Sequence, residues 1–219
     1  MRGGTSVYTS GIYPGHAPMV ALAASAMCRR IERLSVLESL DISGHENEKM
    51  FRSMGFDLEL DDPSAPGLVE ASCGSFKDQI GIMAAALGIE LDRVAFDADF
   101  AAANEDTDLG FITIGAGRIA GYKGSVCGMV GDRSIVECQF VWKLGSNMTP
   151  DWPVTDGYLI EIQGDPAVRC TLSPVGEHFD GAVTTAMPVV NAIPFTVAAA
   201  PGIVNRGDLP FVRGMHTIR

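Results

Sequence analysis

The sequence predicts an α+β domain with a mostly antiparallel or mixed open sheet and helices packed on one face of it. Three observations lead to this prediction: helical hydrophobic spacing up to Gly88, then alternating strands joined by hairpin turns, then a helical segment after Asp180. This order of elements, with helices first, strands next and a helix last, is typical of an α+β domain whose sheet is covered by helices on one side. We find no linker and no internal repeat, so residues 1–219 are expected to form a single domain.

The expected helices follow from apolar spacing and from capping residues. A helix from 46–54 has Ser43 as a plausible cap, residues 57–74 are expected to be loop, and Ser75 with Asp78 forms a capping box for the next helix. The first helix would present one apolar face and end in basic residues that suit a helix C-terminus. That face is made of Met19, Val20, Ala23, Met27 and Ile31.

The expected strands alternate apolar and polar side chains, and Gly131-Asp132 between two of them is a hairpin signal. A second turn is expected at Gly164-Asp165-Pro166. The strands are expected at 35–41, 94–100, 109–130, 135–144, 157–163 and 167–172.

Residues 112–121 read ITIGAGRIAG, in which Gly115, Gly117 and Ala120 form the G-x-G-x-x-A pattern of a dinucleotide-binding turn. Such a turn needs a helix directly after the glycines, because the helix N-terminus binds the pyrophosphate. Here Gly124 and Gly128 follow and the segment runs into a hairpin. We therefore predict that this chain has no cofactor-binding residues of its own and no Rossmann domain, and that the glycines mark bulges or close packing in a strand.

The charge distribution excludes two classes of partner. The formal net charge is -11 and no dense Lys/Arg cluster is present, which argues against nucleic acid and against anionic membranes. Residues 186–204 are uncharged over nearly a membrane span, but Pro188, Pro194 and Pro201 interrupt them. We expect a buried, kinked core helix there. The mean hydropathy of the whole chain is +0.18, which also predicts a substantial buried core.

The five cysteines are scattered, odd in number and never form C-x-x-C. In a chain of this size, that pattern predicts reduced thiols and a cytoplasmic protein. No spacing of cysteines or histidines typical of a metal site is present, so we expect no metal.

Several short stretches, in order along the chain, resemble the C-terminal domain of 2,4-diaminopentanoate dehydrogenases and native amine dehydrogenases, which are relatives of dihydrodipicolinate reductase. The opening GGTSVYTSGIYPGHAP is similar to the T-G-x-N-P-G-F pattern of that family, with Tyr13 where Asn is common and His16 where an aromatic residue is common. The supporting stretches are Asp41-Ile42-Ser43-Gly44, Met54-Gly55-Phe56, Asp151-Trp152-Pro153, 161–166, 190–194 and 200–203. The resemblance covers about residues 3–214.

The resemblance implies a substrate-binding and oligomerisation domain. Full-length members use NAD(P)H to reduce an imine formed from a ketone and ammonia, or oxidise an amine. Their N-terminal Rossmann domain, which carries the cofactor, is absent from these 219 residues. The resemblance therefore implies NAD(P) bound by a separate or truncated domain, a small amine, ketone or imine substrate, and a homodimer.

Four of the candidate substrate-binding residues, Tyr13, Pro14, Gly15 and His16, lie at the start of the first helix. Its free N–H groups, a hydroxyl and an imidazole are suited to orient a small carbonyl or carboxylate substrate. The alternative is a Pro-Gly turn that only sets the helix angle.

Asp41, Ser43 and Gly44 form a second candidate site, because related reductases carry a D-x-x-S-G-T stretch that binds a substrate carboxylate. Ser43 as a plain helix cap is the alternative. Trp152 is a candidate for the wall of an apolar pocket, whereas Trp142 is expected in the core. Asn191 is a polar residue in an apolar helix, where it either contacts substrate or satisfies a carbonyl freed by Pro194.

The leading hypothesis is therefore the substrate-binding half of an NAD(P)-dependent oxidoreductase acting on C–N bonds. The alternative is a non-catalytic assembly module that dimerises through the exposed face of the sheet. A hydrolase is disfavoured because no nucleophile signature such as G-x-S-x-G is present.

Overall fold

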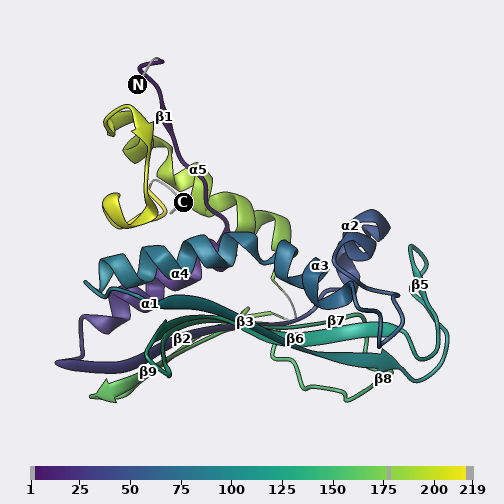
Figure 1. Cartoon of the computed structure of the whole chain (residues 1–219). Helices are drawn as coiled ribbons and strands as arrows, with labels where there is room; N and C mark the ends of the chain where they lie inside the picture. The colour runs from purple at the N-terminus through teal and green to yellow at the C-terminus, as the bar shows by residue number, and fades with distance from the viewer. Residues whose placement is uncertain (1–2, 177–178, 216–219) are drawn as a thin grey trace.

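A computed structural model describes residues 3–176 and 179–215, and it confirms the predicted α+β class. Its centre is a seven-stranded sheet with the strand order β10-β9-β2-β7-β6-β3-β8, seen edge-on in the lower part of Figure 1. The strands are β2 (Arg30–Asp41), β3 (Arg93–Ala103), β6 (Ile119–Val130), β7 (Arg133–Lys143), β8 (Met148–Thr149), β9 (Gly157–Asp165) and β10 (Val168–Leu172).

The sheet is mixed because β2 and β7 run parallel at its centre, while its other neighbouring strands pair antiparallel. The predicted hairpin at Gly131-Asp132 joins β6 to β7, and the turn before β10 is also confirmed. Parallel strands end at the same edge of a sheet. The register accordingly sets Asp41 opposite Lys143, and the Ile42 N–H donates to the Lys143 carbonyl over 2.9 Å.

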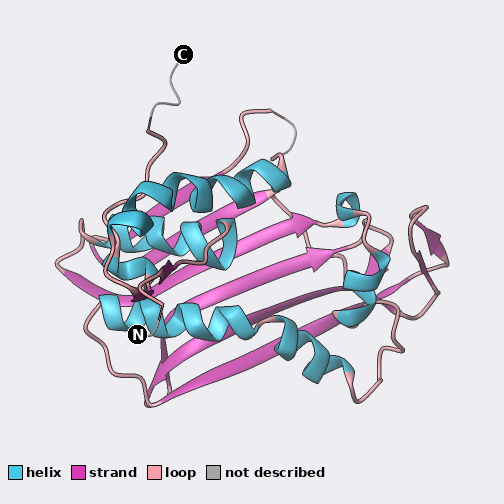
Figure 2. Ribbon diagram, turned by 90° about the horizontal axis from the view of Figure 1, so that it is seen from above, coloured by secondary structure: helices cyan, strands magenta, loops and turns pink. Residues whose placement is uncertain are grey.

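One face of the sheet is covered by helices, as predicted. Seen from above, α1 (Ala17–Ser25) and α4 (Gly74–Ala86) cross the strands, and α3 (Ala65–Ser72) and α2 (Glu48–Ser53) continue this layer (Figure 2). Large apolar side chains fill the space between the layers: Phe76 of α4 meets Phe140 of β7 edge to face, with ring centroids 5.9 Å apart. The main core therefore lies between the sheet and the helices.

The last helix, α5 (Gly181–Ala198), lies in a third tier above α1 and α4 (Figure 1). Its predicted start is confirmed, because Asp180 accepts a hydrogen bond from the Val183 N–H. β1 (Ser6–Val7) and β11 (Gly202–Ile203) pair in parallel beside it, and a short 3-10 turn, η3 (Arg206–Asp208), follows.

The expected burial of α5 is wrong. Only 11% of the helix is buried, and within the described residues it is the one helix long and apolar enough to cross a membrane, which is weak evidence for a membrane location. Its large exposed apolar side chains share one face because they recur at helical spacing. They are Val183, Val190, Ile193 and Val197. The prediction failed because α5 lies outside the two main layers, and the composition of the helix does not encode that position.

The first helix is shorter than predicted. α1 ends at Ser25, so Met27 is 58% exposed and Ile31 belongs to β2. Strand pairing decides this outcome, because Ile31 lies opposite Gly164 of β9. The basic residues that suggested a helix end are in the strand region, where Arg33 pairs with Glu137 over 2.6 Å.

Three local predictions in the helical region also fail. Asn47, not Ser43, caps α2, with its side chain accepting from the Met50 N–H over 3.0 Å, and Ser43 lies in a separate 3-10 turn, η2 (Ser43–His45). The expected loop 57–74 contains α3, because Pro66 occupies the first turn of a helix, where its missing N–H costs nothing. α4 begins at Gly74 without a side-chain cap, so the capping box does not form.

The glycine pattern opens a strand, as predicted, but its detail differs. The expected continuous strand is divided into the small hairpin of β4 (Thr107–Asp108) and β5 (Thr113–Ile114), followed by β6. Gly115 and Gly117 form the turn before β6, where Gly117 has a φ of +77°. Close packing is the role of Gly124 within β6, since a Cβ there would lie 2.3 Å from the Asp97 carbonyl oxygen.

The second face of the sheet carries no helix within the described chain. A loop between β8 and β9 passes beneath it (Figure 1), and Asp151 in this loop accepts a hydrogen bond from Lys143 Nζ over 2.6 Å. We call this side the open face. Its buried charges are paired: Lys143 with Asp151, and Glu137 with Arg33.

Candidate functional site

The helix-facing side chains of β2 are apolar except at one position. Leu34 and Val36 are fully buried in this phase of the strand, and Glu38 follows them with only 7% of its surface exposed. A carboxylate in such a place costs free energy unless its charge is neutralised or it accepts hydrogen bonds. Glu38 is therefore the residue from which a site can be built.

Two aromatic side chains hydrogen-bond Glu38. The indole Nε1–H of Trp142 in β7 donates to Glu38 Oε2 over 2.6 Å, and the Tyr158 hydroxyl of β9 also hydrogen-bonds the carboxyl. Burial raises the pKa of Glu38 to about 7, while the bonds from Trp142 and Tyr158 oppose that rise. At neutral pH the carboxyl can therefore both hold and release a proton.

Glu38 lines a cavity of about 410 Å³ at the carboxyl ends of β2 and β7. This volume is in the range of small-molecule sites. Most of the wall is apolar or aromatic, and η2 and α2 close it opposite the sheet. The lining residues are Glu38, Leu40, Ile42, His45, Asn47, Met50, Met54 and Trp142. We call this the Glu38 cavity.

The turn at Asp41 shapes one rim of the Glu38 cavity. Asp41 Oδ1 accepts from the Ser43 N–H over 3.0 Å and from the Gly145 N–H over 3.3 Å, so it ties the ends of β2 and β7 together. The cavity is lined from this turn by Ile42 and His45, while Ser43 and exposed Gly44 are not part of its wall. Three of the candidate residues thus lie beside the site.

Tyr13 lies behind the Glu38 cavity. It belongs to η1 (Ile12–His16), and its hydroxyl is 2.6 Å from the Val36 carbonyl oxygen and 2.9 Å from that of Gln139. Its ring packs against Tyr158, with centroids 5.8 Å apart, and burial raises the pKa of the hydroxyl well above its usual value. Tyr13 therefore supports the ring that hydrogen-bonds Glu38.

The remainder of that candidate group is used in backbone packing or faces elsewhere. The N–H groups of His16 and Ala17 donate to the carbonyls of Gly11 and Ile12. Pro14 and Gly15 are buried, and a Cβ on Gly15 would lie 2.8 Å from Ser10 Oγ. These residues fix the close approach of η1 to the preceding loop.

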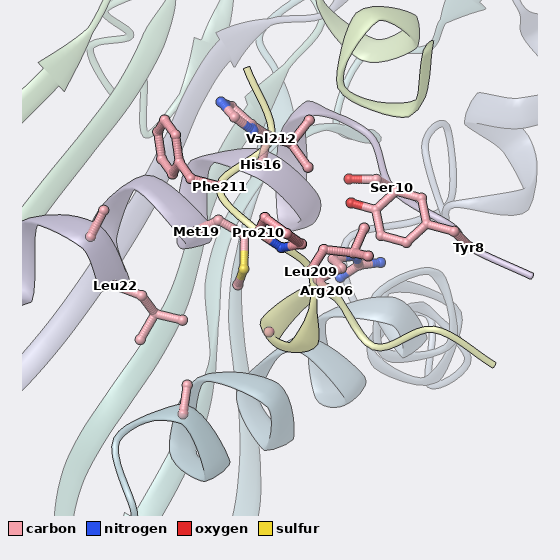
Figure 3. A pocket seen from close by; sticks show the side chains of 13 residues that line it. Tyr8, Ser10, His16, Met19, Leu22, Arg206, Leu209, Pro210, Phe211 and Val212 are labelled. Carbon is pink, nitrogen blue, oxygen red and sulfur yellow. The ribbon is translucent and has the colours of Figure 1, made fainter. Parts of the chain in front are cut away.

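His16 lines a second cavity, of about 260 Å³, formed where the C-terminal segment crosses α1. Figure 3 shows His16 near Phe211 and Val212, with Tyr8, Ser10 and Arg206 on the other side of the hollow. Burial lowers the pKa of His16, so its imidazole is held neutral. The four neighbouring candidates at residues 13–16 are therefore divided between two places.

Trp152 and Asn191 are also apart from the Glu38 cavity. Lys123 Nζ lies 5.3 Å above the Trp152 ring, and Lys123 alternates along β6 with buried Tyr122, which puts this pair on the open face. Asn191 is half-buried on α5 next to Ala192, which is fully buried.

The central residue, Glu38, is one that the sequence analysis did not select. The sequence feature that could have identified Glu38 is the stretch Ser-Val-Leu-Glu-Ser-Leu-Asp at residues 35–41, where a carboxylate occupies an inward-facing position of a predicted strand. The core prediction for Trp142 is confirmed, since its ring stacks on Phe140 at 5.0 Å. Its other role, as a donor to Glu38, depends on the parallel register of β2 and β7.

The glycine turn at residues 115–117 does not fit a dinucleotide. The Gly115 and Ala116 N–H groups, where a pyrophosphate would bind, donate instead to the carboxylates of Asp57 and Asp106 over 2.9 and 2.8 Å. These carboxylates would repel phosphate, and β6 follows where a helix is needed. The described residues also contain no cluster of three or more metal-ligating side chains, and the five cysteines are free.

The fold and the site define an α+β domain built on one seven-stranded sheet, with a small apolar cavity and a buried carboxyl. The chain belongs to the 2,4-diaminopentanoate dehydrogenase C-terminal domain family, whose sequence profile matches residues 18–218. It is 28% identical to an amine dehydrogenase of Streptomyces virginiae over 229 aligned residues, which cover 95% of this chain and 61% of that protein.

A solved structure shows the same fold. The amine dehydrogenase from Mycobacterium smegmatis superposes with a TM-score of 0.76 at 15% identity, over 97% of this chain and 61% of that one. The chain thus spans about three fifths of the length of either relative. The resemblance to the amine dehydrogenase family predicted from short motifs is confirmed.

Proposed function

We propose that this chain is the substrate-binding domain of an NAD(P)-dependent oxidoreductase that acts on C–N bonds, oxidising an amine or reducing an imine formed from a ketone and ammonia. The observation that carries the proposal is the Glu38 cavity, an apolar hollow of about 410 Å³ with one ionisable carboxyl in its wall. Family membership supports the proposed reaction class.

In this proposal the nicotinamide is brought by a dinucleotide-binding domain outside these 219 residues, because the chain's own glycine turn does not fit a pyrophosphate. The chain itself binds and orients the substrate and keeps water from its alkyl part. Residues around the cavity, including Tyr13 and Asp41, act as positioning residues. Chemistry of this kind depends on holding the substrate against the cofactor.

Thermal unfolding with short-chain amines and ketones tests the proposal. A ligand that binds only the folded state stabilises it by about 2.7 kcal/mol at 100 times its Kd, so the midpoint should rise with concentration. Leu40→Trp, which fills the Glu38 cavity, should abolish the rise. Leu22→Trp, which fills the second cavity, is the matched control and should keep it.

Two results would contradict the proposal. One is an unchanged midpoint with every amine and ketone. The other is rapid NAD(P)H oxidation by this chain alone in the presence of a ketone and ammonia, since that would require a cofactor site within these residues.

We also propose that the open face forms a homodimer. Leu37 and Leu159 lie opposite each other on neighbouring strands of that face and are half-buried, and Val141 is near them. Apolar side chains on an uncovered sheet mark association surfaces. Light scattering should report a dimer for the wild type and a monomer for Leu159→Lys; a monomeric wild type would overturn the proposal.

A further inference from the structure

The buried charged side chains of this domain are paired with an opposite charge, except for Glu38. Glu137 is 6% exposed and pairs with Arg33, and Lys143 is 4% exposed and pairs with Asp151. Glu38 is as deeply buried, and no ion pair with a Lys, Arg or His side chain is found for it among residues 3–176 and 179–215. Burying an unpaired ion is costly, whereas a partner of opposite charge offsets part of that cost.

The hydrogen bonds to Glu38 leave room for a further donor. A carboxylate offers about four lone-pair sites. Trp142 and Tyr158 each supply one hydrogen. Since the carboxyl lines the cavity, the remaining acceptor capacity is available to a ligand inside it.

The other walls determine what kind of ligand complements this carboxyl. Leu40, Ile42, Met50 and Met54 present apolar surface, and the Trp142 indole adds an aromatic edge. An alkyl chain would be buried against these walls, and a cationic nitrogen would meet the carboxylate. A small primary ammonium ion has both parts.

The other ionisable groups near Glu38 supply no competing cation from the sheet or the helices. Burial raises the pKa of Tyr13 and Tyr158, so both stay neutral, and it raises the pKa of Cys73 to about 11 and of Cys138 to about 12. His45, at the rim, is the one imidazole that lines the Glu38 cavity. Apart from His45, only a ligand can bring a positive charge to this cavity.

We propose that the Glu38 carboxylate binds the ammonium group of a short aliphatic amine, with its alkyl part against Leu40, Met50 and Met54. This inference rests on the proposed function and names its substrate class and the residue that recognises it. It assigns to Glu38 the selection of the amine over the ketone of the same carbon skeleton.

The Trp142 indole provides a direct signal for the test, because its N–H donates to Glu38. The chain has 2 tryptophans, so its nitrogen–proton correlation spectrum contains two indole signals. The signal that is missing in Trp142→Phe is that of the Trp142 indole. We would titrate the full chain with sec-butylamine and, separately, with 2-butanone, and obtain each Kd from the shift of that signal.

The proposal makes two expectations for sec-butylamine. Its Kd should be about 30-fold weaker at pH 5.5 than at pH 8.5, because the fraction of ionised Glu38 changes by that factor around a pKa near 7. Glu38→Gln, which keeps an acceptor for the indole, should weaken binding at least about tenfold at pH 8.5. His45→Gln should retain the pH dependence, and Glu161→Gln on the open face is the charge control.

The outcomes separate this inference from the proposed function. If the amine binds Glu38→Gln as tightly as the wild type, or with the same Kd at both pH values, the ammonium assignment is overturned while the substrate-binding role stands. If 2-butanone binds more tightly than the amine at pH 8.5, the assignment is likewise overturned. If neither ligand moves the indole signal of the wild type, both proposals fall. The wild-type pH series keeps the test valid should Glu38→Gln fail to fold.

Discussion

The indole N–H of Trp142 donates a 2.6 Å hydrogen bond to the carboxyl of Glu38 across the parallel strand pair at the centre of the sheet. Glu38 is 7% exposed and Trp142 is 9% exposed, so the bond lies in the core. It links the one unpaired buried carboxyl of the described chain to the aromatic cluster of Phe76, Phe140 and Tyr122. The cavity at this bond and the stability of the core are thus coupled.

Glu38 should make the domain less stable as pH rises. Its pKa is raised from 4.5 to about 7 in the folded state, so the folded chain holds a proton that the unfolded chain loses first. The stabilisation is complete below the unfolded pKa and is lost as pH rises through about 7. Relative to Glu38→Gln, urea unfolding should show the wild type losing roughly 2 to 3 kcal/mol between pH 5 and 8. A pH-independent difference between the two proteins would contradict this prediction.

Tyr13→Phe should reduce stability without a large effect on amine binding. The variant leaves two strand carbonyls, of Val36 and Gln139, without the hydroxyl near them, which should cost about 1 to 3 kcal/mol of unfolding free energy. The ring contact with Tyr158 is kept. Thermal unfolding and the indole titration measure the two effects; a tenfold loss of affinity with unchanged stability would show instead that the hydroxyl contacts substrate.

Gly124→Ala should disturb the packing of β3 on β6. Its Cβ would meet the Asp97 carbonyl oxygen at 2.3 Å and the Phe140 ring at 2.7 Å, and such overpacking costs about 1 to 3 kcal/mol. Gly81→Ala is the matched control, because nothing lies within 4 Å of a Cβ there and the site is helical. That change should stabilise by about 0.5 to 1 kcal/mol. Equal denaturation midpoints for the two variants would refute the prediction.

The exposed face of α5 should tolerate polar substitution. Ile193 is 55% exposed, whereas its neighbour Ala192 is fully buried. Ile193→Ser should therefore change the free energy of unfolding by no more than about 0.5 kcal/mol, and Ala192→Leu should cost about 1 to 3 kcal/mol through overpacking. Urea unfolding of the two variants checks the contrast. A large loss in Ile193→Ser would mean that this face is covered in solution.

Several features could be predicted from the sequence because their causes are local. The Gly131-Asp132 hairpin, the start of α5 after Asp180 and the alternation of Val136, Cys138 and Phe140 each depend on a few neighbouring residues. The failure of the glycine pattern to open a helix was also local, since Gly124 and Gly128 follow it. Short motifs in the right order were sufficient to indicate the family.

The errors occurred where distant segments compete. Ile31 continues the predicted helix face, but pairing with β9 draws it into β2. Residues 13–16 form one motif along the chain, yet Tyr13 packs behind the Glu38 cavity while His16 lines another hollow. Cytoplasmic location, NAD(P) dependence and the homodimer remain predictions.

By itself the sequence determined the α+β class, most of the strands and the family, because hydrophobic period, turn chemistry and motif order act over short distances. Only the tertiary structure decided which side chains meet. Glu38 became the centre of the site because β2 and β7 align in parallel and place it beside Trp142. That register is set by packing across the whole sheet, where contacts between residues about a hundred positions apart outweigh the preferences of each segment.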